Sequence, residues 1–280
     1  MSESENSFGS FKVVIQAGHS SAYWKSILEF YELLFVFARR DISVRYKQTT
    51  IGVLWALIKP VFTMVAFTIV FQKIAKLPSF DIPYPLMVFS GLIPWFFFST
   101  AVSEMANSLV SNQHIVSKVY FPRILLPLSA IFVGLVDYIV SCLLLIPLMI
   151  FLSMPLSWHL SGLLPATFLA CLNCAALGIF LAALNVSYRD VRHAIPFLVQ
   201  FGLYISPVGF LTSVIPEQWR ILYSINPIVG TIDLFRWAVS AGKVEIYWPA
   251  VVISIVFSTI LFVMSIFYFR KVERTLADII

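Results

Sequence analysis

Long apolar stretches recur along the chain, each separated from the next by a short polar or proline-containing segment. A membrane-spanning helix needs about 20 mostly apolar residues. The pattern therefore predicts an all-α membrane protein with six transmembrane helices. The predicted spans cover residues 49–72, 86–109, 124–152, 162–185, 194–213 and 248–269.

Residues 27–47 have a different pattern, because charged side chains recur there at helical spacing. Glu29, Glu32 and Arg40 fall on one side of a helical wheel, and apolar residues fall on the opposite side. The stretch is too charged to span a bilayer, so it is predicted to be an amphipathic helix lying in the interface. Arg45 is an exception, because it falls on the apolar side of this wheel.

The stretch before the last span, about 215–242, is apolar but interrupted by Asn226-Pro227 and Gly230. Two short helices fit, at about 216–225 and 229–240, and neither is long enough to cross a membrane. We expect a re-entrant helical hairpin on the outer side, with one further pair of spans as the alternative. Asp233 and Arg236 are three residues apart and are expected to pair on one helix face.

Composition excludes a soluble protein. Apolar residues make up 60% of the 280 residues and charged residues 12%, and the mean hydropathy is +0.90. A soluble domain carries about 25% charged residues. The net charge of +5 does not indicate nucleic-acid binding, because no basic patch interleaved with aromatic residues stands apart from the predicted helices.

The positions of the basic residues predict the orientation. If the N-terminus is cytoplasmic, 13 of the 19 Lys and Arg residues fall in cytoplasmic segments. Basic residues concentrate in cytoplasmic loops, so both termini are predicted to be cytoplasmic. The expected organisation is a flexible N-terminal segment over 1–26, the interface helix over 27–47, a membrane domain over 48–270 and a C-terminal tail over 271–280.

The sequence offers little for catalysis or metal binding. A phosphate-binding loop needs spaced glycines before Lys and Ser or Thr, and Gly242-Lys243, the only Gly-Lys pair, lacks them. The pair Cys171-x-x-Cys174 has no second pair, and the four histidines are scattered, so no metal site or cofactor is expected. We predict that the chain is not an enzyme and that a partner supplies any energy for its work.

Three charges fall inside predicted spans, namely Lys59, Glu104 and Asp137. Such charges are costly in a membrane and often mark function. Lys59 either lines a polar path for an anionic or sugar-rich substrate or extends to the cytoplasmic interface. The aromatic run 95–98 fits either a sugar path, since rings stack on sugar C–H faces, or an interfacial belt. The candidate channel residues are Trp55, Lys59, Trp95, Phe96, Phe98 and Tyr204.

The segment between the second and third spans, about 111–121, predicts a short cytoplasmic helix with an apolar edge. Such a helix could dock into a groove on a soluble ATPase and transmit motion to the spans. The candidate docking residues are His114, Ile115, Val116, Lys118, Val119 and Tyr120.

Six stretches, in order along the chain, resemble the permeases of the ABC-2 type that export polysaccharides. The stretches are 39–60, 89–95, 119–123, 188–190, 225–227 and 269–274. The resemblance implies a homodimer of six-helix subunits in the bacterial cytoplasmic (inner) membrane. It also implies two copies of an ATP-binding subunit that carries ATP and Mg, and a lipid-linked polysaccharide such as an O-antigen as substrate.

The resemblance also implies roles for particular residues. The basic residues Arg39, Arg40, Arg45 and Lys47 are placed where a lipid pyrophosphate head group would enter, and arginine suits this role because its fork holds phosphate oxygens bidentately. The alternative is anchoring at anionic membrane lipids. Segment 111–121 corresponds to the coupling helix. The hairpin at 215–242 corresponds to gate helices, with Trp219, Tyr223, Asp233 and Arg236 as candidate gate residues.

Three other functions remain open from the residues. The chain could be an ABC-2 exporter of drugs or lipids, or an ATP-independent glycolipid flippase. It could also be a membrane enzyme that modifies glycolipids, although that would call for clustered carboxylates or histidines on one membrane face. The sequence shows no such cluster.

Overall fold

The computed structural model describes residues 20–47, 54–76, 78, 82–188 and 190–279, and the described part of the chain is helical without strands. Within it, five helical segments are long and apolar enough to cross a membrane. The chain is thus a multi-pass membrane protein. The five segments are Leu57–Ile74, Tyr84–Ser111, Leu125–Phe151, Trp158–Ser187 and Trp248–Arg274.

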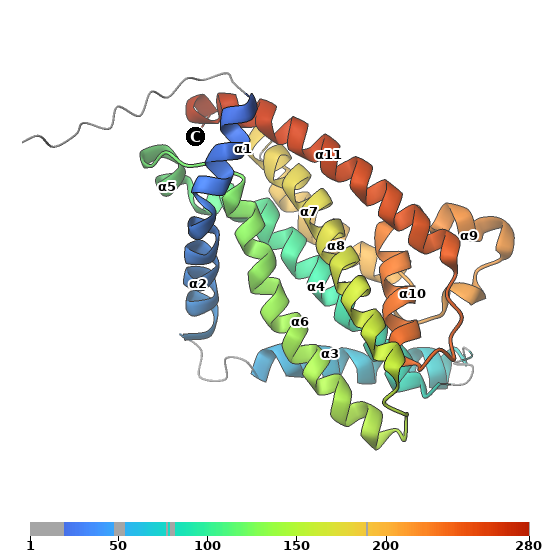
Figure 1. Ribbon diagram of the computed structural model, residues 1–280. Helices are drawn as coiled ribbons and strands as arrows, with labels where there is room; N and C mark the ends of the chain where they lie inside the picture. Colours follow the sequence, from blue (N-terminus) through green and yellow to red (C-terminus); the bar gives the residue numbers. More distant parts are fainter. Residues whose placement is uncertain (1–19, 48–53, 77, 79–81, 189, 280) are drawn as a thin grey trace, which may run out of the picture.

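Helix α4 (Tyr84–Ser111) is the centre of the bundle. It packs against α6 (Leu125–Phe151) and α7 (Leu163–Ser187), and α11 (Trp248–Ile279) packs on the far side of α7 (Figure 1). In the most apolar 18-residue stretch of α4, 83% of the residues are buried, against 28% in α11. The outer helices therefore present most of their apolar surface to the surroundings, as lipid-facing helices do.

Buried polar side chains tie these helices together. Asn173 on α7 donates to the Thr231 hydroxyl at 2.8 Å and accepts a hydrogen bond from Ser258 of α11. Asn185 donates to the Ala106 carbonyl of α4 at 2.7 Å. Apolar side chains gain little by leaving lipid for one another, so hydrogen bonds and close packing hold such bundles together.

Helix α3 (Leu54–Phe67) contains Pro60 and continues into a π-helix, η1, at Thr68–Ile74. Together they occupy most of the predicted first span, of which residues 49–53 lie outside the described part. In Figure 1, α3 crosses the lower part of α6 instead of running alongside it. Only 6% of the residues in this segment are buried, so its apolar surface has few partners within one chain.

The predicted span over 194–213 is not confirmed. Helix α8 (Val191–Ile205) has 15 residues and ends before Ser206-Pro207, which makes it shorter than a spanning helix needs to be. Proline lacks the backbone N–H that would continue the helix. The chain then runs irregularly to a short 3-10 turn, η3, at Thr212–Val214. Six spans therefore remain a prediction.

The predicted interface helix is divided in two. Helix α1 (Ser20–Glu29) is followed by a turn at Phe30 and then by α2 (Tyr31–Lys47), which packs along α6. Most of the predicted flexible segment, residues 1–19, lies outside the described part. At the other end, α11 continues through the predicted tail to Ile279, since no proline or glycine interrupts it after Pro249.

The two short helices predicted before the last span are confirmed, as α9 (Glu217–Tyr223) and α10 (Pro227–Val239). Asn226 caps α10 by accepting a hydrogen bond from the Ile228 amide, and Pro227 occupies its first turn, both favoured positions. Helices α9 and α10 lie at the opposite end of the molecule from α1 and from α5 (Gln113–Lys118) (Figure 1). Their depth in the membrane stays a prediction. A 3-10 helix, η2 (Trp158–Gly162), precedes α7.

Candidate functional site

The structure brings together three charged residues that lie far apart in the sequence. Arg45 on α2 lies 2.9 Å from the Asp137 carboxylate of α6 and 3.8 Å from the Glu104 carboxylate of α4. Tyr46 donates a hydrogen bond to the second Asp137 oxygen. This contact explains why Arg45 falls on the apolar side of the predicted wheel: that side of α2 faces the bundle, and the bundle offers two carboxylates there.

The other basic residues of α2 are divided between ion pairing and exposure. Arg40 pairs with the adjacent Asp41 at 2.7 Å and lies over the Phe37 ring. Arg39 and Lys47 are exposed. Two of the four candidate head-group residues are thus paired with carboxylates, and two remain accessible. Their role toward a lipid head group stays a prediction.

Lys59 and Phe96, both candidate channel residues, are in contact. The Lys59 ammonium lies 4.9 Å from the centre of the Phe96 ring, within the range of a cation–π interaction. Lys59 is exposed and Phe96 is half-buried. The pair therefore presents a positive charge and an aromatic face together on the surface where α3 crosses α4.

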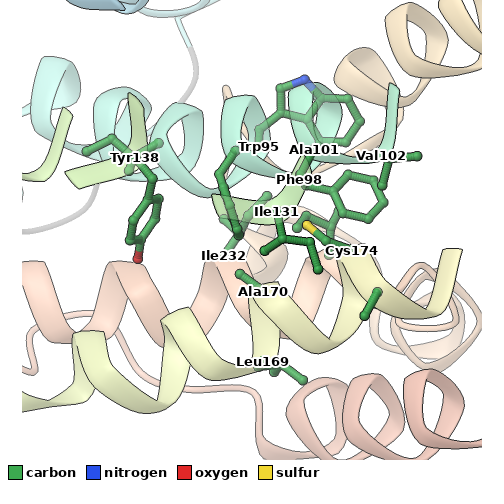
Figure 2. Packing of buried hydrophobic residues seen from close by; sticks show 14 of the residues in the cluster. Trp95, Phe98, Ala101, Val102, Ile131, Tyr138, Leu169, Ala170, Cys174 and Ile232 are labelled. Carbon is green, nitrogen blue, oxygen red and sulfur yellow. The ribbon is translucent and has the colours of Figure 1, made fainter. Parts of the chain in front are cut away.

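The rest of the aromatic run is packed inside the bundle. Trp95 and Phe98 are 4% and 7% exposed, and their ring centres lie 5.8 Å apart (Figure 2). Trp95 approaches Gly202 of α8 so closely that a Cβ there would meet its ring at 2.7 Å. Phe96 is thus the member of these three that reaches the surface. Tyr204 on α8 is exposed, and Trp55 lies on α3 with its side chain outside the described part.

The predicted coupling segment forms the short helix α5 and the turn after it. Val116 is buried, Ile115 is half-buried, and Val119 and Tyr120 are 56% and 64% exposed. His114 and Lys118 are also exposed. One side of the segment is therefore anchored in the bundle, while a valine and a tyrosine stand free for a partner. Their role in docking a partner stays a prediction.

Two hydrogen bonds, called the clasp below, join Arg123, which follows the predicted coupling segment, to Glu273 of α11. The sequence did not predict this contact. The Arg123 amide donates to the Glu273 carboxylate at 2.8 Å, and the Arg123 guanidinium donates to the Glu273 carbonyl at 2.9 Å. Nearby, the Arg270 guanidinium lies 4.8 Å from the centre of the Tyr23 ring. Helices α1 and α11 thus meet close to the segment that precedes α6. The sequence offered one indication of this contact, because Arg123 and Glu273 both belong to the stretches that carry the family resemblance.

Arg236 of α10 is buried and binds backbone carbonyls. Its guanidinium donates to the carbonyls of Met87, Pro207, Val208 and Phe210 at 2.8–3.2 Å. Three of these carbonyls belong to the irregular segment after α8, where no helix supplies donors. Arg236 therefore holds this segment against α4 and α10. Burial lowers the pKa of the guanidinium to about 10, which leaves it charged at neutral pH.

The expected ion pair between Asp233 and Arg236 is wrong, because neither group lies within ion-pair distance of the other in the part of the chain that the structure describes. The helix spacing is right, but Arg236 is drawn to the carbonyls. Asp233 instead accepts a hydrogen bond from Thr212 at 2.7 Å. Burial raises the pKa of the Asp233 carboxyl to about 6, against the opposing effects of Thr212, Arg236 and Arg220.

The other two candidate gate residues lie on α9. Trp219 is 56% exposed, and Tyr223 donates a hydrogen bond to the Ile205 carbonyl at 2.6 Å, which closes the end of α8. Burial raises the pKa of the Tyr223 phenol, so this hydroxyl remains a donor. The described residues contain no group of three or more His, Cys, Asp and Glu side chains that could hold a metal ion.

The ABC-2 type transporter family profile matches residues 32–240, a range that begins in α2 and ends directly after α10. The match covers most of the chain, and the chain belongs to this family. The matched range thus includes the charged cluster around Arg45, the short helix α5 and the helices α9 and α10.

Named relatives are similar over most of their own length. The chain is 28% identical to the O-antigen export system permease protein RfbA of Myxococcus xanthus over 221 residues, covering 76% of this chain and 82% of the relative. It is 25% identical to a Klebsiella pneumoniae protein of the same name, covering 89% and 95%. Identity to the polysialic acid transport protein KpsM of Escherichia coli is 26%, covering 74% and 80%.

Proposed function

We propose that this chain is the membrane subunit of an ABC transporter that exports a lipid-linked polysaccharide across the cytoplasmic membrane. ATP hydrolysis on a separate, cytoplasmic subunit drives the export, and two copies of each subunit make the complete transporter. The observation that carries the proposal is the family match over 32–240, together with relatives named for O-antigen and polysialic acid export.

The geometry supports a coupling mechanism at the end that carries α5. Val119 and Tyr120 form the exposed docking surface, and Arg123 with Glu273 fixes that surface to α11. Because α5 also connects α4 to α6 directly, a push on it reaches three long helices at once. Motion of an ATP-binding partner would in this way change how the spans pack.

The substrate path is proposed to run past Lys59 and Phe96. A lysine suits a pyrophosphate-linked lipid, because its ammonium is a mobile positive charge, and the adjoining ring offers a stacking face for sugars. The exposed Arg39 and Lys47 on α2 would attract the phosphates of the lipid first. The largely unpartnered surface of α3 fits a second copy of the chain, so that this path lies between two subunits.

The test is co-purification with candidate ATP-binding subunits, followed by an ATPase assay of the complex in lipid. We expect Val119→Ser with Tyr120→Ser to reduce complex formation at least tenfold, which corresponds to about 1.4 kcal/mol. The matched control is Val44→Ser with Tyr31→Ser, a similarly exposed pair on α2. Export that continues in cells without any ATP-binding partner would instead favour an ATP-independent flippase.

A further inference from the structure

We propose that the outer hairpin carries a binding site for a single sugar residue, in a cavity between η3, α9 and the segment 243–247 before α11. This site is distinct from the surface formed by Lys59 and Phe96. The inference rests on the proposed function only for the origin of the sugar, which would be the part of the glycan that has already crossed the membrane.

The cavity has a volume of about 320 Å³, at the lower end of the range for small-molecule sites. Seven of the ten residues that line it have polar side chains. They include Thr212, Arg220, Asp233, Lys243, Glu245 and Tyr247.

Asp233 supplies a buried acceptor in this cavity. The residue is 6% exposed, and one of its carboxylate oxygens accepts the hydrogen bond from Thr212. The other oxygen, Oδ2, is buried and has no hydrogen-bond partner among the described residues. A buried carboxylate oxygen without a donor is costly, so a hydroxyl donor that enters the cavity would be strongly favoured there.

Arg220 and Tyr247 supply a rigid wall. The Arg220 guanidinium lies 5.3 Å from the centre of the Tyr247 ring, and it donates to the carbonyls of Ser213 and Ile215 at 3.3 and 3.1 Å. These contacts fix the guanidinium in place, while its Nε has no partner in the described part of the chain. A ligand would meet a fixed donor group next to an aromatic ring.

The charges of the cavity select for a neutral ligand. Arg220 and Lys243 are balanced by Asp233 and Glu245, so neither a phosphate nor a cation meets a uniform field. A sugar hydroxyl both donates and accepts hydrogen bonds, which matches carboxylates that only accept and basic groups that only donate. The C–H face of a sugar also matches the ring of Tyr247. Binding here would hinder an exported chain from sliding back.

The site can be tested on the full-length chain in lipid nanodiscs, by saturation-transfer difference NMR with galactose, mannose, rhamnose and N-acetylglucosamine. Detergents with maltose or glucose head groups must be avoided, because they would compete for the site. We expect at least one sugar to bind with a millimolar Kd. Asp233→Asn, which keeps an acceptor for Thr212, and Tyr247→Leu should each weaken binding about tenfold or more.

Tyr31→Leu is the matched control, because Tyr31 is an exposed tyrosine at the start of α2 and does not line the cavity. If Asp233→Asn fails to fold, Glu245→Gln and Lys243→Gln at the exposed rim replace it, with a weaker loss expected. Binding of no sugar, equal binding by all variants, or saturable binding of inorganic phosphate in place of sugar would each overturn the site. Sugar binding requires neither ATP nor a partner, so its failure is separable from failure of the proposed export.

Discussion

The guanidinium of Arg45 lies 2.9 Å from the Asp137 carboxylate, and this ion pair joins α2 to the middle of α6. Tyr46 donates to the same carboxylate from the next position on α2. A carboxylate within an apolar helix is costly unless it is paired. The charge at Asp137 is therefore tolerated because α2 packs against α6, and α2 is held in place by that charge.

Removing either member of this pair should destabilise the protein. We expect Arg45→Gln and Asp137→Asn each to lower the free energy of unfolding by about 1–3 kcal/mol, because each leaves a half-buried charge without its partner. The double variant should lose less than the sum of the two. The coupling energy is measured by unfolding the unchanged protein, the two single variants and the double variant in the same detergent. Arg40→Gln is the control, since Arg40 pairs within its own helix, and additive losses would show that the pair contributes nothing.

The contact between Lys59 and Phe96 should matter for transport more than for folding. We expect Lys59→Met to reduce export several-fold with little change in thermal stability, because exposed cation–π pairs contribute only about 0.5–1 kcal/mol. Lys59→Arg keeps the charge and should retain most activity. The measurement is surface polysaccharide in a host deleted for its own permease. Lys73→Met, at an exposed lysine on η1, is the control and should export normally.

Replacing Arg236 by lysine should be severe despite the retained charge. One ammonium cannot reach the four carbonyls that the guanidinium binds, so at least two buried carbonyls would lose their donor. We expect Arg236→Lys to lower the free energy of unfolding by about 2–5 kcal/mol. Arg192→Lys, at an exposed position of α8, should change it by less than about 0.5 kcal/mol. Similar unfolding curves for the two variants would contradict the role given to Arg236.

Asp233 should make stability depend on pH. Its pKa rises from the usual value of 3.8 to about 6 on folding, so the folded protein binds the proton more tightly. The stabilisation is complete below about pH 4 and is lost as the pH rises through about 6, by up to about 3 kcal/mol. Asp233→Asn removes this titration. Thermal unfolding of both proteins between pH 4 and pH 8 gives the difference, and parallel curves would refute the assignment.

Hydropathy predicts α4, α6, α7 and α11 well. A run of about 20 apolar residues in a membrane must satisfy its backbone hydrogen bonds internally, and a helix does so. It fails after Ile205, where the sequence stays apolar but Pro207 cannot continue a helix. A hydropathy value averaged over about 20 residues does not detect that Pro207 lacks a backbone N–H. The structure resolves this locally through Arg236, whose guanidinium supplies the missing donors.

The candidate site could be predicted in its parts but not in its contacts. Arg45, Glu104 and Asp137 each stood out as charges in apolar surroundings, yet they lie on three helices, and nothing in their spacing indicates that they meet. The spacing of Asp233 and Arg236 was misleading for a related reason. Helical periodicity describes neighbours within one helix, whereas the carbonyls that bind Arg236 come from α4 and from the segment after α8.

The clasp between Arg123 and Glu273 has a consequence for biosynthesis. Arg123 directly follows the proposed docking segment, and Glu273 follows it 150 residues later in the sequence, so a ribosome delivers the two halves of the clasp at different times. A chain that stops short of α11 still anchors Val116 in the bundle, but it lacks the contact with Glu273 that holds the turn after Val119 and Tyr120. The proposed docking surface for an ATP-binding subunit would therefore be complete only once α11 has been inserted, which would delay assembly until then.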